Sequence, residues 1–239
     1  MDYQTVFKRY EMKYMISRQQ KEKLLEVIQE YMKLDQFGHS LIRNIYYDTD
    51  SYQLIRHSIE KTFYKEKLRV RSYGSSGNDS TVFVELKKKY DSVVYKRRIG
   101  LEKQDAILWL DNKIECPKQT QISKEIDYFK DFYKTLHPVV FLSYEREAYY
   151  SLCGDDFRIT FDENIKCRED ELFIDSDIFG IPVLDKDTIL LEIKTSGAIP
   201  LWMTKFLTIN KIYRTSFSKY GSVYQNIILK RELGGRAYA

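Results

Sequence analysis

Residues 67–101 decide the fold and have the sequence KLRVRSYGSSGNDSTVFVELKKKYDSVVYKRRIGL. Charged and apolar residues alternate here in three stretches, residues 67–73, 81–90 and 92–101. Such alternation is typical of half-buried β-strands, because successive side chains point to opposite faces. The Gly- and Ser-rich residues 74–79 fit the first turn. The stretch therefore predicts three consecutive antiparallel strands, each with one apolar and one charged face.

The charged face of these strands is rich in lysine and arginine, and other predicted strands repeat the pattern. The simpler interpretation of any single strand is an ordinary wet sheet face, but such faces mix serine, threonine and glutamine with charges. Here basic residues recur at two-residue spacing, and like charges on neighbouring strands destabilise a sheet. The basic residues are Arg9, Lys13, Lys67, Arg69, Arg71, Lys87, Lys96, Arg98, Arg146, Arg158 and Lys194, and Tyr144 shares their face. We therefore expect these faces to line a groove or closed tunnel that holds a polyanion.

Rows of arginine and lysine suit a chain of phosphates. Arginine binds phosphate oxygens through parallel hydrogen bonds, and lysine supplies point charges. A few carboxylates accompany them, namely Glu11, Glu85, Asp162 and Glu192. Carboxylates are poor phosphate contacts but common ligands of Mg²⁺ or Mn²⁺ beside phosphates. Cations and a few carboxylates on one wall predict phosphoryl transfer, which depends on positioning and charge neutralisation.

The composition excludes several other classes of protein. With 39 Lys+Arg against 35 Asp+Glu in 239 residues, the net charge is only +4, unlike that of a histone-like polycation. Aromatic residues lie mainly opposite the charged faces, which argues against nucleic-acid binding. No apolar run approaches the ~20 residues of a membrane span. The first residues lack a signal-peptide pattern, and the 3 cysteines lack metal-ligand spacing. We therefore expect a cytoplasmic protein with reduced thiols, no membrane span and no nucleic-acid partner.

The remaining patterns predict a mixture of strands and helices. Strands are expected at residues 7–16, 41–47, 139–148, 158–167 and 188–194, and helices at residues 17–34, 51–57, 102–110, 122–136, 200–209 and 218–229. The acidic residues 168–187 predict a loop. About eight strands with interspersed helices indicate an α+β domain built on one antiparallel sheet or barrel. We expect one domain over residues 1–230 and a flexible tail over residues 231–239.

Eight short motifs occur in order from about residue 6 to residue 225. They are FKRYEMKY (7–14), IYYDT (45–49), KLRVRSYG (67–74), VELK (84–87), SYER (143–146), RITFD (158–162), LEIK (191–194) and FSKY (217–220). One motif alone would be weak, but the ordered set is specific. It resembles the VTC domain of polyphosphate polymerases, a family of the CYTH-like triphosphate tunnel metalloenzymes.

The resemblance implies an α+β fold in which an eight-stranded antiparallel β-barrel forms a tunnel with helices packed outside. It also implies a phosphotransferase that transfers the γ-phosphoryl group of ATP to a growing inorganic polyphosphate chain, with Mn²⁺ or Mg²⁺. By motif, the catalytic residues are Lys13, Arg69, Arg71, Arg146 and Glu192.

The resemblance and the basic faces together give the phosphate-binding residues and the metal ligands. The phosphate-binding residues are Arg9, Lys67, Lys87, Lys96, Arg98, Tyr144, Arg158, Lys194, Ser218 and Lys219. The metal ligand by resemblance is Glu192, and Glu11, Glu85 and Asp162 are further carboxylates on the same faces. The consecutive residues Lys96, Arg97 and Arg98 leave open which of the three face the tunnel.

Two positions depart from the related patterns. Arg9 stands where tunnel triphosphatases and cyclases have the first carboxylate of their ExExK pattern. The polymerase branch shares this difference, which argues against simple hydrolysis. Ser216 stands where the family has a lysine, and Arg214 is a candidate to replace it.

The sequence also leaves other functions open. One is a non-catalytic accessory module that binds polyphosphate or nucleotide, and another is a tunnel triphosphatase that hydrolyses nucleotide or inorganic triphosphate. The presence of the whole set of catalytic residues favours an enzyme. ATP and inorganic polyphosphate are the expected ligands. A membrane-protein partner, the oligomeric state, the primer and the product length are left open.

Overall fold

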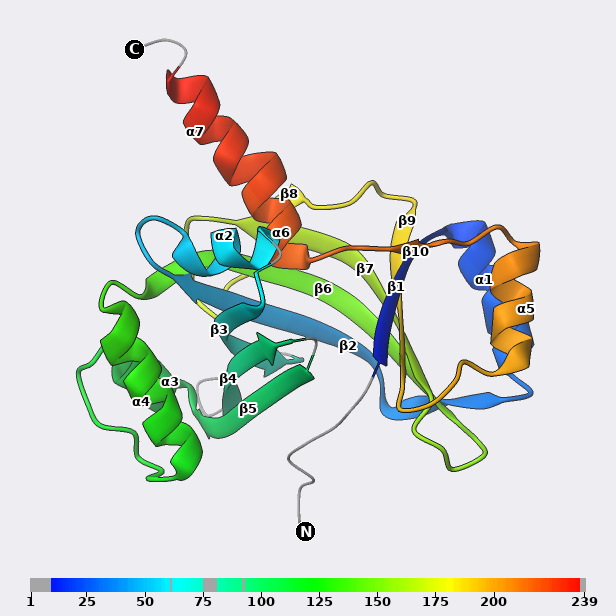
Figure 1. Ribbon diagram of the computed structural model, residues 1–239, viewed down its shortest axis with the longest axis horizontal. Coiled ribbons are helices and arrows are strands. Elements are labelled where there is room, and N and C mark those ends of the chain that lie inside the picture. The colour runs from blue at the N-terminus through cyan, green and yellow to red at the C-terminus, as the bar shows by residue number, and fades with distance from the viewer. Residues whose placement is uncertain (1–9, 61, 75–80, 92, 237–239) are drawn as a thin grey trace.

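The structure is a computed structural model that describes residues 10–60, 62–74, 81–91 and 93–236. One antiparallel sheet runs through these residues (Figure 1). Its strands are β1 (Tyr10–Ser17), β2 (Met32–Asp48), β3 (Tyr64–Tyr73), β4 (Thr81–Tyr90), β5 (Val93–Glu102), β6 (His137–Ser151), β7 (Arg158–Arg168), β8 (Ile181–Pro182), β9 (Thr188–Thr195) and β10 (Arg214–Thr215). The helices are α1 (Arg18–Ile28), α2 (Gln53–Ile59), α3 (Lys103–Leu110), α4 (Gln121–Tyr133), α5 (Leu201–Ile209), α6 (Lys219–Val223) and α7 (Leu229–Arg236), and the π-helical turn η1 (Tyr224–Ile228) joins the last two. None of the helices in these ranges is long and apolar enough to cross a membrane.

The strands follow the order β10-β1-β9-β7-β6-β2-β3-β4-β5, and β8 pairs with β7. The expected α+β class with an antiparallel sheet is confirmed. The sheet differs from the expected eight-stranded barrel in two ways. It has 10 strands, because the two-residue strands β8 and β10 add to the eight long ones. Within the described ranges, no backbone ladder joins its two ends, so the sheet is not closed into a barrel.

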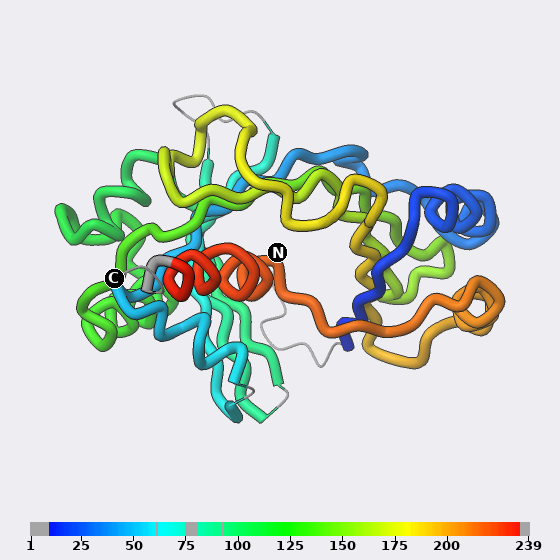
Figure 2. The backbone as a smooth tube through the Cα atoms, turned by 90° about the horizontal axis from the view of Figure 1, so that it is seen from above, coloured from blue at the N-terminus to red at the C-terminus, as the bar shows by residue number. Residues whose placement is uncertain are grey.

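The sheet curls until its two ends approach each other. Five strands separate β1 from β4 in the sheet order, yet Lys87 Nζ on β4 lies 4.0 Å from Glu11 Oε2 on β1. Seen from above, β1 and β9 face β3, β4 and β5 across the molecule (Figure 2). Side chains of β1 and β4 thus meet between the two ends of the sheet, where a closed barrel would have backbone hydrogen bonds.

Helices cover the outer, apolar face of the sheet at both ends (Figure 1). At one end α3 and α4 pack on β3, β4 and β5 around Trp109 and Leu86, which are buried. At the other end α1 and α5 pack on β1, β7 and β9 around Leu24 and Ile193. Ser17 caps α1 as expected, because its hydroxyl accepts a hydrogen bond from the Gln20 amide.

The inner face changes from apolar to charged along the strands. Tyr144 and Leu190 belong to a buried cluster that α2, α6 and η1 complete. Arg146 and Glu192 follow them by two residues on the same strands, and therefore share their face. The expectation that helices pack outside is thus incomplete, because α6 covers the apolar end of the inner face.

Two expected helix boundaries differ from the observed ones. The first helix is expected to reach Leu34, but α1 ends at Ile28, and residues from Met32 belong to the 17-residue strand β2. The last helix is expected to end near Leu229, but α7 continues to Arg236. Residues 237–239 lie outside the described ranges.

Candidate functional site

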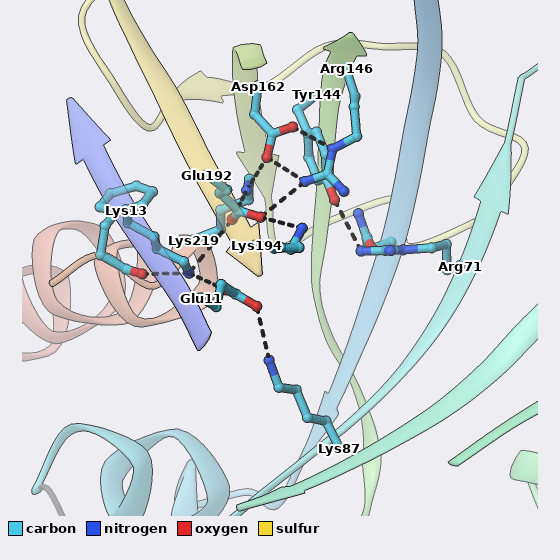
Figure 3. Close-up of polar contacts among 12 residues, drawn as sticks. Glu11, Lys13, Arg71, Lys87, Tyr144, Arg146, Asp162, Glu192, Lys194 and Lys219 are labelled. Carbon is cyan, nitrogen blue, oxygen red and sulfur yellow. Dashed lines mark hydrogen bonds and ion pairs between the residues drawn. The ribbon is translucent and has the colours of Figure 1, made fainter. Parts of the chain in front are cut away.

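Basic side chains from separate strands and from α6 converge on the charged end of the inner face (Figure 3). We call these residues the basic cluster: Lys13, Lys67, Arg69, Arg71, Lys87, Lys96, Arg98, Arg146, Lys194 and Lys219. The carboxylates of Glu11, Glu85, Asp162 and Glu192 lie between them. All fourteen were predicted to share the charged faces or to bind phosphate, so the sequence pattern identified a set of residues that the fold brings together.

Lys13 lies between two carboxylates, where β1 pairs with β9. The register places Lys13 opposite Glu192. Its Nζ is 3.4 Å from Glu11 Oε1 and 3.6 Å from Glu192 Oε1, and it donates to the Phe217 carbonyl at 2.9 Å. The last contact joins β1 to the segment that leads into α6.

Asp162 holds two cations from different elements. Arg146 donates to both of its carboxylate oxygens, at 2.6 Å from Nη2 to Oδ2, and Lys219 donates to Oδ2. Asp162 is fully buried. Burial alone would raise the pKa of Asp162, but Arg146 and Lys219 outweigh it and hold the pKa below its usual range. The carboxylate therefore stays charged and orients both cations.

Glu192 lies among cations that come from β9, β6 and α6. It lies 3.0 Å from Lys194 Nζ and 3.5 Å from both Arg146 Nη2 and Lys219 Nζ. Burial would raise the pKa of Glu192, but these cations, Lys194 foremost, hold it well below its usual range. Glu192 is thus an ionised carboxylate surrounded by positive charge.

Glu85 plays a similar part on β4. Arg69 donates to Glu85 Oε2 from Nε at 2.8 Å and from Nη2 at 2.6 Å. Lys96 Nζ and Arg98 Nε each lie 2.8 Å from Glu85 Oε1. Burial would raise the pKa of Glu85, but these neighbours, together with Arg71, hold it well below its usual range. Its two oxygens are therefore engaged by basic groups from β3 and β5.

Neutral residues hold two guanidinium groups in place; of these, Tyr144 was a predicted site residue, whereas Asn44 and Tyr46 were not. The amide oxygen of Asn44 accepts from Arg71 Nε at 2.9 Å, and Tyr144 Oη accepts from Arg71 Nη2 at 3.0 Å. Tyr46 Oη accepts from Arg69 Nη1 at 3.2 Å. Asn44 is uncharged and therefore absent from any charge pattern. The alternation of β2, which places Asn44 and Tyr46 on one face, was the available signal.

Lys67 stands apart because no carboxylate of the described residues pairs with it. Its Nζ donates to Ser218 Oγ at 2.9 Å. Burial, followed by the nearby charges of Lys87 and Lys13, lowers the pKa of Lys67 to about 7. Its surroundings thus disfavour the charged ammonium, and a bound anion would favour it.

The contacts of Lys96, Arg97 and Arg98 show which of these side chains face inward. The register places Lys96 opposite Lys87 and Arg98 opposite Glu85, so both lie on the inner face. Arg97 points the other way and donates from Nε to Glu125 on α4 at 3.0 Å. Lys96 and Arg98 belong to the cluster, and Arg97 belongs to the outer face.

Among the predicted basic phosphate-binding residues that the structure describes, Arg158 alone is not part of the cluster. Arg158 pairs opposite Lys194, but its guanidinium turns to Asp35 at 2.7 Å, and its side chain is 43% exposed. It lies at the margin of the charged face. Arg9 lies outside the described residues.

Glu11 and Glu192 fit a divalent metal best, because a cation already lies between them. The Lys13 ammonium is held by one oxygen of each. Glu85 and Asp162 direct their oxygens at guanidinium groups instead. Two carboxylates leave most of an Mg²⁺ or Mn²⁺ shell to phosphate oxygens and water, as is common for these ions. In the part of the chain that the structure describes, no three His, Cys, Asp or Glu gather as a metal site.

Solved structures of other proteins share this fold. A proposed adenylate cyclase from Bacillus halodurans superposes with a TM-score of 0.54 at 18% identity, covering 87% of this chain and 92% of that chain. A proposed adenylyl cyclase from Hippeastrum, reported to have a dominant triphosphatase activity, gives a TM-score of 0.52 at 15% identity, covering 90% of this chain and 94% of that chain. At these identities the likeness shows the fold alone.

A family model gives a more specific assignment than the likeness in fold. The model of the VTC domain matches residues 8–228, nearly the whole chain, and the chain therefore belongs to the VTC domain family. A search of curated proteins found no match.

Proposed function

We propose that this protein is a polyphosphate polymerase, which transfers the γ-phosphoryl group of ATP to the end of an inorganic polyphosphate chain. The observation that carries the proposal is the basic cluster, in which lysines and arginines from six strands and α6 meet on one face of the curled sheet. A surface of this kind suits a ligand with many phosphates in a row better than one with a single phosphate.

The proposed step breaks the bond between the γ-phosphorus of ATP and its bridging oxygen and forms a bond to a terminal oxygen of the polyphosphate. ADP leaves. The chain's own residues bind and align the two phosphate chains and neutralise charge on the transferred group. Lys67 and Arg71 donate their hydrogen bonds to neutral groups and are the strongest candidates for this charge neutralisation. Glu192 and Glu11 would hold a divalent metal, which would supply further neutralisation of phosphate charge.

Pure protein incubated with ATP and Mn²⁺ tests the proposal. Long polyphosphate together with ADP is the expected product. Release of orthophosphate would instead identify a tunnel triphosphatase, and tight polyphosphate binding without turnover would identify an accessory module. The matched variants are Arg71→Met, within the cluster, and Arg97→Met, on the outer face of β5. Polymer synthesis should fall in the first variant and persist in the second.

A further inference from the structure

Asp48 is a buried carboxylate outside the basic cluster, and its contacts join three elements. It ends β2 and is fully buried. Its Oδ1 accepts from the amides of Thr49 and Leu54, both at 2.8 Å. Its Oδ2 accepts from the Ile55 amide at 3.0 Å and from Tyr220 Oη at 2.9 Å. One side chain therefore fixes the start of α2 and also reaches α6.

Tyr220 is held at both its hydroxyl and its ring. The ring stacks on Tyr46, with centroids 4.8 Å apart and an interplanar angle of 25°. Tyr46 in turn accepts the hydrogen bond from Arg69. Tyr220 is buried, and a stacked ring with a bonded hydroxyl has little freedom to move. The first turn of α6 is thereby fixed against β2.

The two residues that precede Tyr220 carry the chemistry of the site. Lys219 contacts Asp162 and, at 3.5 Å, Glu192. Ser218 caps α6 by accepting from the Gly221 amide at 3.1 Å, and it receives the hydrogen bond from Lys67. Because neighbouring helical residues point in different directions, Tyr220 faces the apolar end of the inner face while Lys219 faces the charged end.

We propose that Asp48 and Tyr220 are positioning residues, which set Lys219 against a bound phosphate chain. The proposal rests on the proposed function, because it assumes that the cluster binds phosphate chains. It accounts for the Asp48 and Tyr220 positions of the IYYDT and FSKY motifs, which lie away from the charged face. A site is precise when the residues that touch the ligand are themselves locked by buried hydrogen bonds.

A double-mutant cycle tests this role with inorganic tripolyphosphate as the probe and calorimetry as the measurement. Tyr220→Phe removes one hydroxyl and keeps the stacked ring. It should weaken tripolyphosphate binding about fivefold to tenfold, the scale of one hydrogen bond. In a Lys219→Met background the same substitution should change binding less than twofold, because the residue it positions is gone. In a Lys87→Met background the full factor should remain, since Lys87 contacts Glu11 on β1.

Tyr224→Phe is the matched control, because Tyr224 follows on the same helical segment but its ring packs at a tilt against Tyr52, which is not a residue of the basic cluster. It should leave binding unchanged. Equal losses from Tyr220→Phe in the wild-type and Lys219→Met backgrounds would overturn the positioning role, as would an equal loss in Tyr224→Phe. If Tyr220→Phe fails to fold, Asp48→Asn takes its place in the same cycle. Failure of the wild-type protein to bind tripolyphosphate would overturn the proposed function itself. Binding by the wild-type protein together with additive losses in the cycle would overturn the positioning role alone.

Discussion

Lys67 and Ser218 are 151 positions apart in the sequence, yet Nζ of the first donates to Oγ of the second at 2.9 Å. The bond joins β3 to the N-cap of α6, on opposite sides of the charged face. The partner is neutral, so it leaves the ammonium charge uncompensated. An anion bound in the cluster would therefore interact directly with the uncompensated charge of Lys67.

Binding of tripolyphosphate should therefore take up protons near pH 8. In the empty protein, burial and the neighbouring lysines hold the pKa of Lys67 at about 7, and a bound polyanion raises it. The lysine is then largely neutral before binding and charged after it, so affinity should fall as pH rises above about 7. Calorimetry in two buffers with different ionisation enthalpies measures the uptake. Lys67→Met should reduce it, whereas Lys88→Met, which removes an outer lysine paired with Glu66, should not.

The empty protein should show the opposite trend in stability. Unfolded lysine titrates near 10.5, so between about pH 7 and 10.5 the unfolded state binds more protons at residue 67 than the folded state. The contribution of Lys67 to the free energy of unfolding should therefore increase with pH over this window. Urea denaturation at several pH values compares the wild-type protein with Lys67→Met. An identical pH slope in both would contradict the assignment.

Glu192→Gln should separate turnover from binding. The substitution removes one of two carboxylates proposed for the metal, so metal-dependent turnover should fall at least about 100-fold, as for removal of a directly acting group. Tripolyphosphate affinity should stay the same or increase, because Lys194, Arg146 and Lys219 lose a competing anion. Glu125→Gln on the outer face is the control. Full turnover in Glu192→Gln would remove this residue from the metal role.

Arg98→Met and Arg97→Met form a neighbouring pair with opposite expectations. Arg98 contacts Glu85 on the inner face, and Arg97 contacts Glu125 on α4. Loss of the inner guanidinium should weaken tripolyphosphate binding about tenfold, the scale of a charge-assisted hydrogen bond. Loss of the outer one should have little effect. Calorimetry would show an error in the predicted direction of these side chains if the two variants lost affinity equally.

Asp162→Ala should be the most destabilising of the carboxylate substitutions. It leaves Arg146 and Lys219 buried together without their shared partner, and removal of one member of a buried ion pair costs about 3–5 kcal/mol. Asp35→Ala, which breaks a half-exposed pair with Arg158, should cost less than about 1 kcal/mol. Urea denaturation measures both. Added tripolyphosphate should recover more stability in Asp162→Ala than in wild type, because it supplies the missing negative charge.

Alternation along single strands was sufficient to predict most of the charged face. Glu11, Lys13, Arg69 and Glu85 were all placed on one face by two-residue periodicity, which depends only on local backbone geometry. The same information could not orient residues 96–98, because three consecutive basic residues fit either face. The distant Glu125 on α4 resolves that choice.

Long-range pairing explains the errors in the fold. Residues 32–34 continue an amphipathic helical pattern, yet they join β2 because they pair with residues 149–151 on β6. A register shift between Leu34 and His39 accommodates the turn-forming residues between them. The barrel was expected to close, but closure depends on strand register at the sheet ends, which no local pattern specifies. Asn44 and Asp48 were likewise missed as functional candidates because their partners are remote in sequence.

The inward concentration of lysine and arginine has a consequence for the rest of the surface. In the cluster, the basic residues outnumber the carboxylates by more than the +4 net charge of the whole chain. The remainder of the chain is therefore close to neutral overall. It adds little long-range attraction for a polyanion, so the attractive field is concentrated where these strands converge. An anion that reaches this one place meets the protein's excess positive charge, so the charge distribution itself favours ligands that can contact the cluster.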